Sequence, residues 1–304
     1  MRRAVFFGFA AAVALLVHPG DTGDLAFFVH TSEKLFSGWA GLFADPNVQV
    51  GPLQLLLFRI GDLAGALALL VQMGTAALLW VTAGRLLPKR RVRFGVCLAA
   101  VALGLTYGAY QDGHPAQVVI PLLWVLAACD AREGRVVRAG ALVGLSAGLE
   151  AWGVLGAVVL VLAPHLRAAV RGLAVQIGVS TALFLPFVAA GEFRMFEYRW
   201  RVNGDTLLGL VVEPGSDFTW SMRLAQGLVA VTAGAGVALA LRRSLHAVWL
   251  APLTVVAVRL VLDPVRYPWY WLAVQTLALL GAAALLTSPG FARMRHRKDV
   301  AVVR

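Results

Sequence analysis

About ten long apolar segments divide this 304-residue chain, and the charged residues between them separate by sign. One set of connecting loops carries nearly all of the Arg and Lys, and the alternate set carries nearly all of the Asp and Glu. A segment that crosses a bilayer must satisfy its backbone hydrogen bonds internally, which favours helices. The pattern predicts an all-α membrane protein with about ten transmembrane helices in a single polytopic domain, residues 1–304.

The composition excludes a soluble protein. Hydrophobic residues make up 60% of the chain, charged residues 14%, and the mean hydropathy is +0.77. Soluble domains carry about 25% charged residues. The net charge of +11 is compatible with nucleic-acid binding, but the basic residues lie in short loops beside apolar segments, where membrane topology explains them. We therefore expect membrane lipid around the chain and no nucleic-acid partner.

The predicted helices occupy most of the chain. Several are shorter than the ~20 residues of a perpendicular span. The segment that follows Gly51 and Pro52 is too long, and we expect it to begin as a short interfacial piece with Arg59 and Asp62 near the outer boundary. The segments lie at about 3–18, 52–85, 92–109, 116–130, 136–149, 151–163, 172–190, 223–241, 245–262 and 268–287.

The charge of the loops predicts the orientation of the protein. Because basic loops stay in the cytoplasm, we expect both termini inside the plasma membrane and the 19–51 and 191–222 loops outside. Three acids, Asp130, Glu133 and Asp299, accompany the basic residues on the inner side. These basic residues are Arg2, Arg3, Arg85, Lys89, Arg90, Arg91, Arg93, Arg132, Arg135, Arg138, Arg167, Arg171, Arg242, Arg243, Arg293, Arg295, Arg297, Lys298 and Arg304.

Residues 136–163 are open to two interpretations. A single helix would put Arg167 and Arg171 outside and reverse every later loop. Two segments that meet at Glu150 keep the charge pattern consistent. They also bring Glu150 to the outer side, whereas a continuous helix would leave this carboxylate in hydrocarbon at a cost of several kcal/mol. We favour the break.

The predicted outer loops contain the residues whose side chains are suited to catalysis or binding. In the 18–51 loop, Asp24 precedes apolar residues at helical spacing, which predicts a short helix in the membrane interface. The next outer loop, YGAYQDGHP, places Asp112 and His114 within one turn. Acids and aromatic residues also fill the 191–220 loop. Arginines and an aromatic turn complete the outer set: Arg194, Arg199, Arg201, Arg266 and Tyr267.

These elements, in this order, resemble the GT-C superfamily of integral membrane glycosyltransferases, which use polyprenyl-phosphate sugars. The likeness covers most of the chain. An acid after the first helix, in Gly23-Asp24-Leu25, is followed by an interfacial helix. A Tyr-Gly/Gly-His element, an Ala-Gly-x-x-x-Gly-Leu run before Glu150 and an Arg-Tyr-Pro turn follow. The resemblance implies a sugar transferase, mannosyltransferase-like, with Asp24 as the catalytic acid of the first outer loop.

The residue types also suit the chemistry of such a transfer, independently of the family resemblance. One carboxylate must deprotonate an acceptor hydroxyl as it attacks the anomeric carbon. Asp24 and Asp112 are the candidates. Arginine suits bidentate contacts to the departing phosphate. We assign substrate binding to His114, Glu150, Arg194, Arg199, Arg201, Arg266 and Tyr267.

Each candidate also has a structural alternative. Either Asp24 or Asp21 suits the cap of the interfacial helix, and Arg266 suits a place at the membrane surface. Asp112 and His114 are open to divalent-cation binding, but two ligands at this spacing form no metal motif, and we assign no metal ligand. The cysteines, Cys97 and Cys129, are placed for neither an outer disulfide nor a metal site.

Three functions remain open. The leading interpretation is transfer of a sugar from a polyprenyl-phosphate donor to an extracytoplasmic glycan or lipid acceptor by an inverting mechanism. A lipid or solute transporter needs ionisable residues deep in its helices, and only Arg259 and Asp62 qualify. The third is a non-catalytic assembly subunit with a glycosyltransferase-like fold, because the chain is short and has Glu150 where such enzymes often have Lys.

Overall fold

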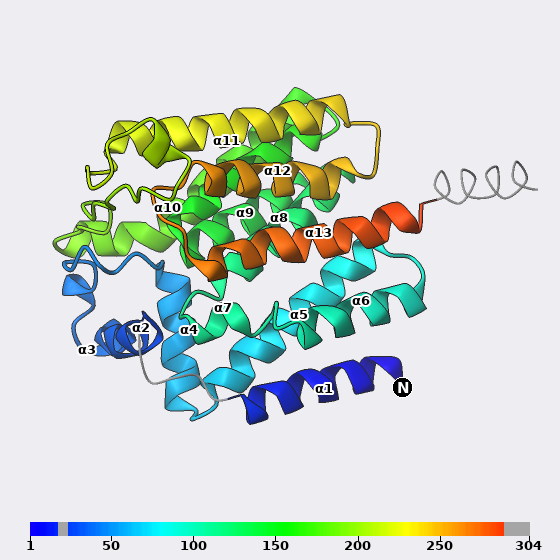
Figure 1. Ribbon diagram of the computed structural model, residues 1–304, viewed down its shortest axis with the longest axis horizontal. Coiled ribbons are helices and arrows are strands. Elements are labelled where there is room, and N and C mark those ends of the chain that lie inside the picture. Colours follow the sequence, from blue (N-terminus) through cyan, green and yellow to red (C-terminus); the bar gives the residue numbers. More distant parts are fainter. Residues whose placement is uncertain (18–23, 289–304) are drawn as a thin grey trace, which may run out of the picture.

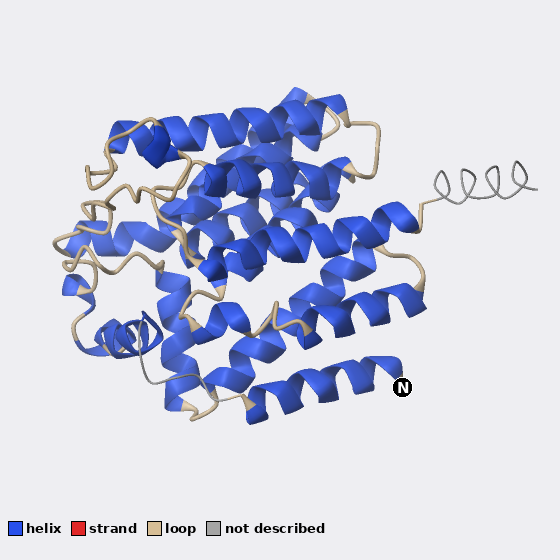
Figure 2. Cartoon of the chain, in the orientation of Figure 1, coloured by secondary structure: helices blue, strands red, loops and turns tan. Residues whose placement is uncertain are grey.

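The computed structural model describes residues 1–17 and 24–288 of the chain. Within this part, every regular element is a helix and no strand is present, as Figure 2 shows. The predicted all-α class is therefore confirmed. Asp21, Asp299 and the basic tail at 293–298 lie outside the described residues.

The helices follow the predicted order, with additional short elements at one end of the bundle (Figure 1). They are α1 (Arg2–Leu16), α2 (Asp24–Ser32), α3 (Lys34–Ser37), η1 (Trp39–Gly41), α4 (Pro52–Leu63), α5 (Leu67–Leu86), α6 (Arg90–Ala102), α7 (Gly108–Gln111), α8 (Ala116–Arg132), α9 (Val136–Leu149), η2 (Ala151–Leu162), α10 (Leu166–Ala190), η3 (Leu208–Leu210), α11 (Trp220–Ala240), α12 (Ala247–Val261), η4 (Pro268–Tyr270) and α13 (Trp271–Leu286).

Among the described residues, four helices are long and apolar enough to cross a membrane: α5, α10, α11 and the continuous stretch of η4 and α13. The predicted count of ten spans is not confirmed. Helices α4, α6, α9 and α12 have 12 to 15 residues. At 1.5 Å per residue they extend about 18–23 Å, which is less than the ~30 Å hydrocarbon thickness.

The 52–85 segment, too long for one span, is interrupted after a short initial piece, as expected. Helix α4 ends where Gly65 adopts a positive φ of 58°. The Ala66 amide donates to the Gly61 carbonyl and the Gly65 amide donates to the Asp62 carbonyl, both at 2.9 Å. This is the glycine-terminated Schellman end of a helix. The expected short initial piece is therefore α4, with Arg59 paired to Asp62 at 3.1 Å.

The predicted break at Glu150 is confirmed. Helix α9 ends at Leu149, and η2 turns back along it, so that Val136 and Leu160 both approach Gly172. A 3₁₀ helix rises about 2.0 Å per residue, so the 12 residues of η2 extend about 24 Å, close to the ~21 Å of the 14-residue α9. The two arms match in length, and both remain shorter than a perpendicular span.

Helix α8 lies at the centre of the bundle and packs against α5, α9, η2, α12 and α13. Nearly all of its side chains are buried. Its Trp124 is fully buried, and the indole Nε1 donates to Ser146 Oγ at 3.0 Å and to the Gly153 carbonyl at 3.2 Å. These bonds connect α8 to both arms of the α9–η2 pair.

The loops gather at two ends of the bundle. In Figure 1 the start of α1, the α11–α12 connection and the end of α13 lie to the right, while α2, α3 and the loop before α11 lie to the left. Arg132 donates to the carbonyls of Arg242 and Ser244, and Arg242 donates to the Ala163 carbonyl, which joins three connections at the first end. We call this the basic end and the opposite one the acidic end.

A buried carboxylate stabilises the basic end. The Asp130 side chain is 1% exposed and contacts Arg85 at 3.6 Å, Arg135 at 2.6 Å and Arg138 at 2.5 Å. Glu133 contacts Arg85 at 2.5 Å but remains 45% exposed. Two of the acids predicted among the basic loops are thus paired with arginines.

We predict that Asp130→Asn lowers the free energy of unfolding by about 1.5–3 kcal/mol, because the buried carboxylate loses its charge-assisted hydrogen bonds to the partly exposed arginines around it. The matched change Glu133→Gln should cost less than about 1 kcal/mol, because exposed ion pairs contribute little. Thermal unfolding of both variants in the same detergent measures the difference. Equal losses would contradict the role assigned to the buried carboxylate.

Candidate functional site

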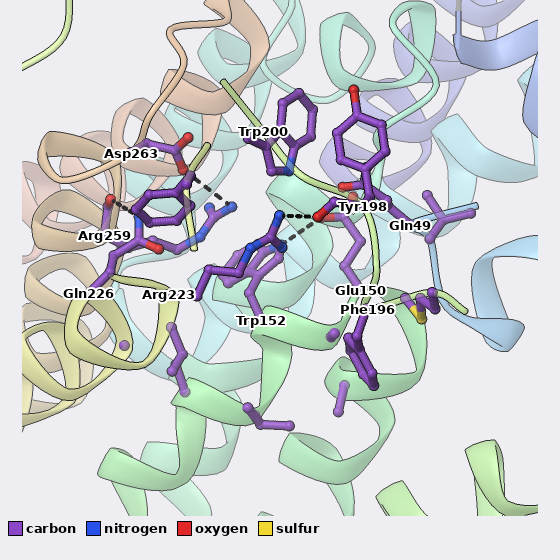
Figure 3. Close-up of a pocket in the computed structure, with 18 of the residues that line it drawn as sticks. Gln49, Glu150, Trp152, Phe196, Tyr198, Trp200, Arg223, Gln226, Arg259 and Asp263 are labelled. Atoms are coloured by element: carbon purple, nitrogen blue, oxygen red, sulfur yellow. Dashed lines mark hydrogen bonds and ion pairs between the residues drawn. The ribbon is translucent and has the colours of Figure 1, made fainter. Parts of the chain in front are cut away.

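A cavity of about 1130 Å³ lies at the acidic end of the bundle. Its lining comes from α2, the 47–50 segment, η2, α10, the loop before α11, α11 itself and the turn before α13. Aromatic residues form much of the wall, including Trp152, Tyr198, Trp200 and Tyr267. Figure 3 shows the rings of Trp152, Tyr198 and Trp200 around a space that charged side chains also enter.

The first charged group in the cavity is a carboxylate–histidine cluster of Asp24, His114 and Glu150. The Nε2 atom of His114 lies 2.9 Å from Asp24 Oδ2, and its Nδ1 atom lies 3.3 Å from Glu150 Oε1. The Asp24 side chain is 55% exposed, whereas those of His114 and Glu150 are 13% and 9% exposed. One imidazole therefore bridges an accessible carboxylate and a buried one.

The close contact of α2 with the loop before α8 brings Asp24 to His114. Gly113 has a positive φ of 79°, and a Cβ atom at this position would lie 2.6 Å from the Leu25 nitrogen. Gln54 of α4 donates to the Gly113 carbonyl at 2.9 Å. Only glycine fits this approach without strain, so the sequence Gly113-His114 places the imidazole directly beside the start of α2.

Glu150 is fixed by the break between α9 and η2. It forms an isolated antiparallel bridge with Val50, and the Gly51 amide donates to the Leu149 carbonyl at 2.6 Å. The Oε2 atom accepts hydrogen bonds from Gln117 Nε2 at 2.9 Å and from Trp152 Nε1 at 2.6 Å. A buried carboxylate needs such compensation.

The environment of His114 favours its protonated form. Burial lowers the pKa of His114, but the hydrogen bonds and charges of Asp24 and Glu150 outweigh it and raise the pKa to about 9. The ring stacks on Trp269, with centroids 5.8 Å apart and an interplanar angle of 7°, and Phe28 meets its edge at 5.5 Å. His114 is therefore a cation at neutral pH.

The second charged group is the arginine pair, Arg223 of α11 and Arg259 of α12. Arg259 lies 3.8 Å from Asp263 and over the ring of Trp152, 4.6 Å from its centroid. Arg223 donates to the Tyr198 carbonyl at 2.8 Å. In the view of Figure 3, Arg223 projects between the Arg259–Asp263 contact and Glu150.

Asp263 is the carboxylate that accompanies the arginine pair. Burial raises the pKa of Asp263, and the charges of Arg259 and Arg223 oppose that rise. The Val265 amide donates to its Oδ1 atom at 3.3 Å. The pair thus has one partly compensating carboxylate for two guanidinium groups.

The remaining wall of the cavity is apolar and reaches the outer surface of two long helices. Phe184 and Val188 of α10 and Leu224 and Leu228 of α11 line it. Leu224 and Leu228 are each 68% exposed, and Val188 is 50% exposed. The cavity therefore extends to the faces of α10 and α11, both of which are long and apolar enough to span a membrane.

The structure brings only part of the predicted site into the cavity. Asp24, His114, Glu150 and Tyr267 line it. Asp112 does not line it. Burial raises the pKa of Asp112; the nearby charge of His114 lowers it and that of Asp24 raises it further, so that the pKa lies above its ordinary value.

The four predicted phosphate-binding arginines have other partners and do not line the cavity. Each forms a hydrogen bond within the loops of the acidic end. The contacts are Arg194 with Glu197 at 2.7 Å, Arg199 with Asp217 at 3.2 Å, Arg201 with the Gly215 carbonyl at 3.1 Å and Arg266 with the Asp205 carbonyl at 3.0 Å.

Sequence reasoning missed the cavity position of the arginine pair. It considered Arg259 as an ionisable residue deep in a helix, and it gave neither Arg259 nor Arg223 a place in the site. The available signal was that both arginines lie in apolar helices toward the acidic end. A charge in such a segment is costly, which marks it as a candidate functional residue.

Within residues 1–17 and 24–288, no group of three or more His, Cys, Asp or Glu side chains is arranged to hold a metal ion. Comparisons of the chain with protein-family models, with curated proteins and with solved structures find no match. The geometry of the cavity is therefore the basis for assigning a function.

We predict that Gly113→Ala destabilises the protein more than Gly104→Ala. Both glycines have positive φ values, 79° and 73°, but an added Cβ meets α2 at Gly113 and nothing within 4 Å at Gly104. The backbone penalty is about 1 kcal/mol for each, and the collision raises the loss at Gly113 to about 3 kcal/mol or more. Thermal unfolding of the two variants tests this, and equal losses would contradict the close packing of α2 on Gly113.

Proposed function

We propose that the protein transfers a sugar from a polyprenyl-phosphate donor to an acceptor hydroxyl. The observation that carries this proposal is that one cavity combines an accessible carboxylate, two guanidinium groups, aromatic walls and an apolar flank. A phosphorylated lipid that carries a sugar has complementary parts for each of these features. The cavity volume of about 1130 Å³ is slightly above the ~300–1,000 Å³ typical of small-molecule sites.

Asp24 is the proposed general base. Its Oδ2 atom contacts His114, while Oδ1 has no hydrogen-bond partner among the described residues. In the proposed reaction the acceptor oxygen attacks the anomeric carbon as its proton passes to Asp24. The bond between that carbon and the donor phosphate oxygen breaks, and the electron pair leaves with the polyprenyl phosphate. A single displacement inverts the anomeric centre.

Arg223 and Arg259 are the proposed ligands of the phosphate. They line the cavity, whereas the four arginines expected from sequence do not. Guanidinium groups offer paired donors to phosphate oxygens, and burial strengthens their attraction for the charge on the leaving group. The apolar flank formed by α10 and α11 suits the polyprenyl chain, and Trp152, Trp200 and Tyr267 suit the sugar faces.

The proposal places the acidic end outside the plasma membrane and both termini in the cytoplasm. The support is the segregation of charge: arginines dominate the connections at the basic end, as expected of cytoplasmic loops. The acceptor would then be an extracytoplasmic glycan or lipid.

We predict that Asp24→Asn lowers the rate of transfer by roughly 10²–10⁴-fold. Asparagine keeps an oxygen that can accept from His114, so the fold should remain. The assay uses purified protein in liposomes with polyprenyl phosphates that carry different hexoses or pentoses and a panel of acceptors. Asp205→Asn, an exposed carboxylate of the same end that does not line the cavity, is the matched control. Full transfer by Asp24→Asn would remove Asp24 from the mechanism.

The phosphate ligands give a separate prediction. Arg223→Lys and Arg259→Lys should each weaken donor binding by about 10- to 100-fold, because a charge-assisted hydrogen bond contributes about 1.5–3 kcal/mol. Binding of a short-chain polyprenyl monophosphate is the measurement, and Arg266→Lys is the comparison. A larger effect at Arg266 would restore the assignment made from sequence. Binding by the wild type without transfer to any acceptor would favour the non-catalytic subunit.

Cysteine labelling in intact cells tests the proposed orientation. Ser37→Cys at the acidic end should react with an impermeant thiol reagent from outside, and Arg243→Cys at the basic end should react only after the membrane is opened. The native cysteines, Cys97 and Cys129, are buried and should contribute little background. The reverse pattern would overturn the proposed orientation.

A further inference from the structure

We infer that His114 is an imidazolium that fixes the Asp24 carboxylate for its reaction, with Glu150 as its buried counter-charge. The protonated bridge is a property of the chain alone. Its role in directing Asp24 rests on the proposed function. His114 and Glu150 are then positioning residues, and Asp24 alone contacts the acceptor.

The geometry around the two ring nitrogens leads to this inference. Both face carboxylate oxygens, Asp24 Oδ2 at 2.9 Å and Glu150 Oε1 at 3.3 Å. Ionised carboxylates only accept hydrogen bonds, and a neutral imidazole has a single N–H group. A neutral ring would therefore direct a lone pair at one of the two carboxylates. A doubly protonated ring satisfies both contacts.

The hydrogen bonds of Glu150 assign it to the supporting side of the bridge. One oxygen faces His114, and the other accepts from Gln117 and Trp152. Its side chain is 9% exposed. These contacts hold the carboxylate in one orientation, and both of its oxygens have partners. Asp24 has the opposite character, because one of its oxygens is free among the described residues and its side chain is 55% exposed to the cavity side.

The surroundings also prevent the ring from turning. Trp269 stacks on one face of His114 and Phe28 contacts its edge. The groups that bear on the charge of His114 come from three elements: Asp24 of α2, Asp112 of its own loop and Glu150 after α9. All three are carboxyl groups.

The titration of His114 follows from this arrangement. Its pKa in the folded protein, about 9, lies above the ordinary value of 6.5. The bridge therefore stabilises the fold fully below pH 6.5, and that contribution is lost as the pH rises through about 9. Carboxylates within hydrogen-bonding distance typically shift a pKa by about 1–3 units.

The direct test is an NMR titration of protein selectively labelled with ¹⁵N-histidine in detergent micelles. The chain has six histidines, and the spectrum of His114→Gln assigns the resonances of His114. We expect both ring nitrogens to remain protonated to about pH 9. Asp24→Asn should lower the midpoint by about 1–3 pH units. Glu33→Gln, which alters an exposed carboxylate 3.5 Å from His30, should leave it unchanged.

A midpoint at or below the ordinary histidine value, or one that Asp24→Asn does not move, would overturn the imidazolium bridge. Because Asp24 is exposed, its substitution by asparagine should leave a folded protein for this measurement. Glu150→Gln provides a second variant, with the same direction of shift expected where the protein folds.

The positioning role is tested by transfer activity as a function of pH. Wild-type kcat should fall above about pH 9, as His114 loses its proton. His114→Gln keeps a donor toward Asp24 but no charge, so kcat should fall at least tenfold, KM should change little, and the alkaline limb near pH 9 should disappear. An unchanged profile in His114→Gln would contradict positioning. A protonated bridge in a wild type without transfer would contradict the proposed function and leave the bridge intact.

Discussion

Glu150 is a buried carboxylate, and the arrangement of the acidic end depends on compensating its charge. It interrupts what would otherwise be one apolar helix, so that α9 and η2 fold back on each other. Its backbone pairs with Val50. Its side chain accepts hydrogen bonds from Gln117 and Trp152 and contacts the imidazole of His114. An ionised group in an apolar bundle is tolerated only with such partners. The same contacts connect α8, the α9–η2 break and the 47–50 segment at Glu150.

Charge is organised along the cavity as well as across the bundle. Two carboxylates and a histidine form one group, two arginines with Asp263 form the other, and aromatic rings make up much of the wall around them. In the proposed reaction a proton is removed from the acceptor at the first group and negative charge develops on phosphate at the second. Because low-dielectric walls strengthen both interactions, fixed charges in this cavity act more strongly than the same residues would on the surface.

Some of the residues predicted for the site lie together in the cavity because their local sequence constrains them. Gly113-His114 and the acid at the start of α2 are brought together by a glycine that only a close approach requires. The break at Glu150 follows from the cost of a carboxylate in hydrocarbon. Arg194, Arg199, Arg201 and Arg266 do not line the cavity, because they bond to acceptors in the loops of the acidic end. Local sequence does not reveal which of several arginines turns inward.

The sequence by itself determined the helical class, the two ends of opposite charge and the interruption at Glu150. Each of these depends on hydropathy or charge, which are properties of the residues in order along the chain. Only the tertiary structure decided that the 52–85 segment bends at Gly65 and that Arg223 and Arg259 share a cavity with Asp24. Those results depend on how helices distant in sequence pack and on which polar groups they leave to be satisfied. Contacts between side chains more than a hundred residues apart are not encoded in any local pattern.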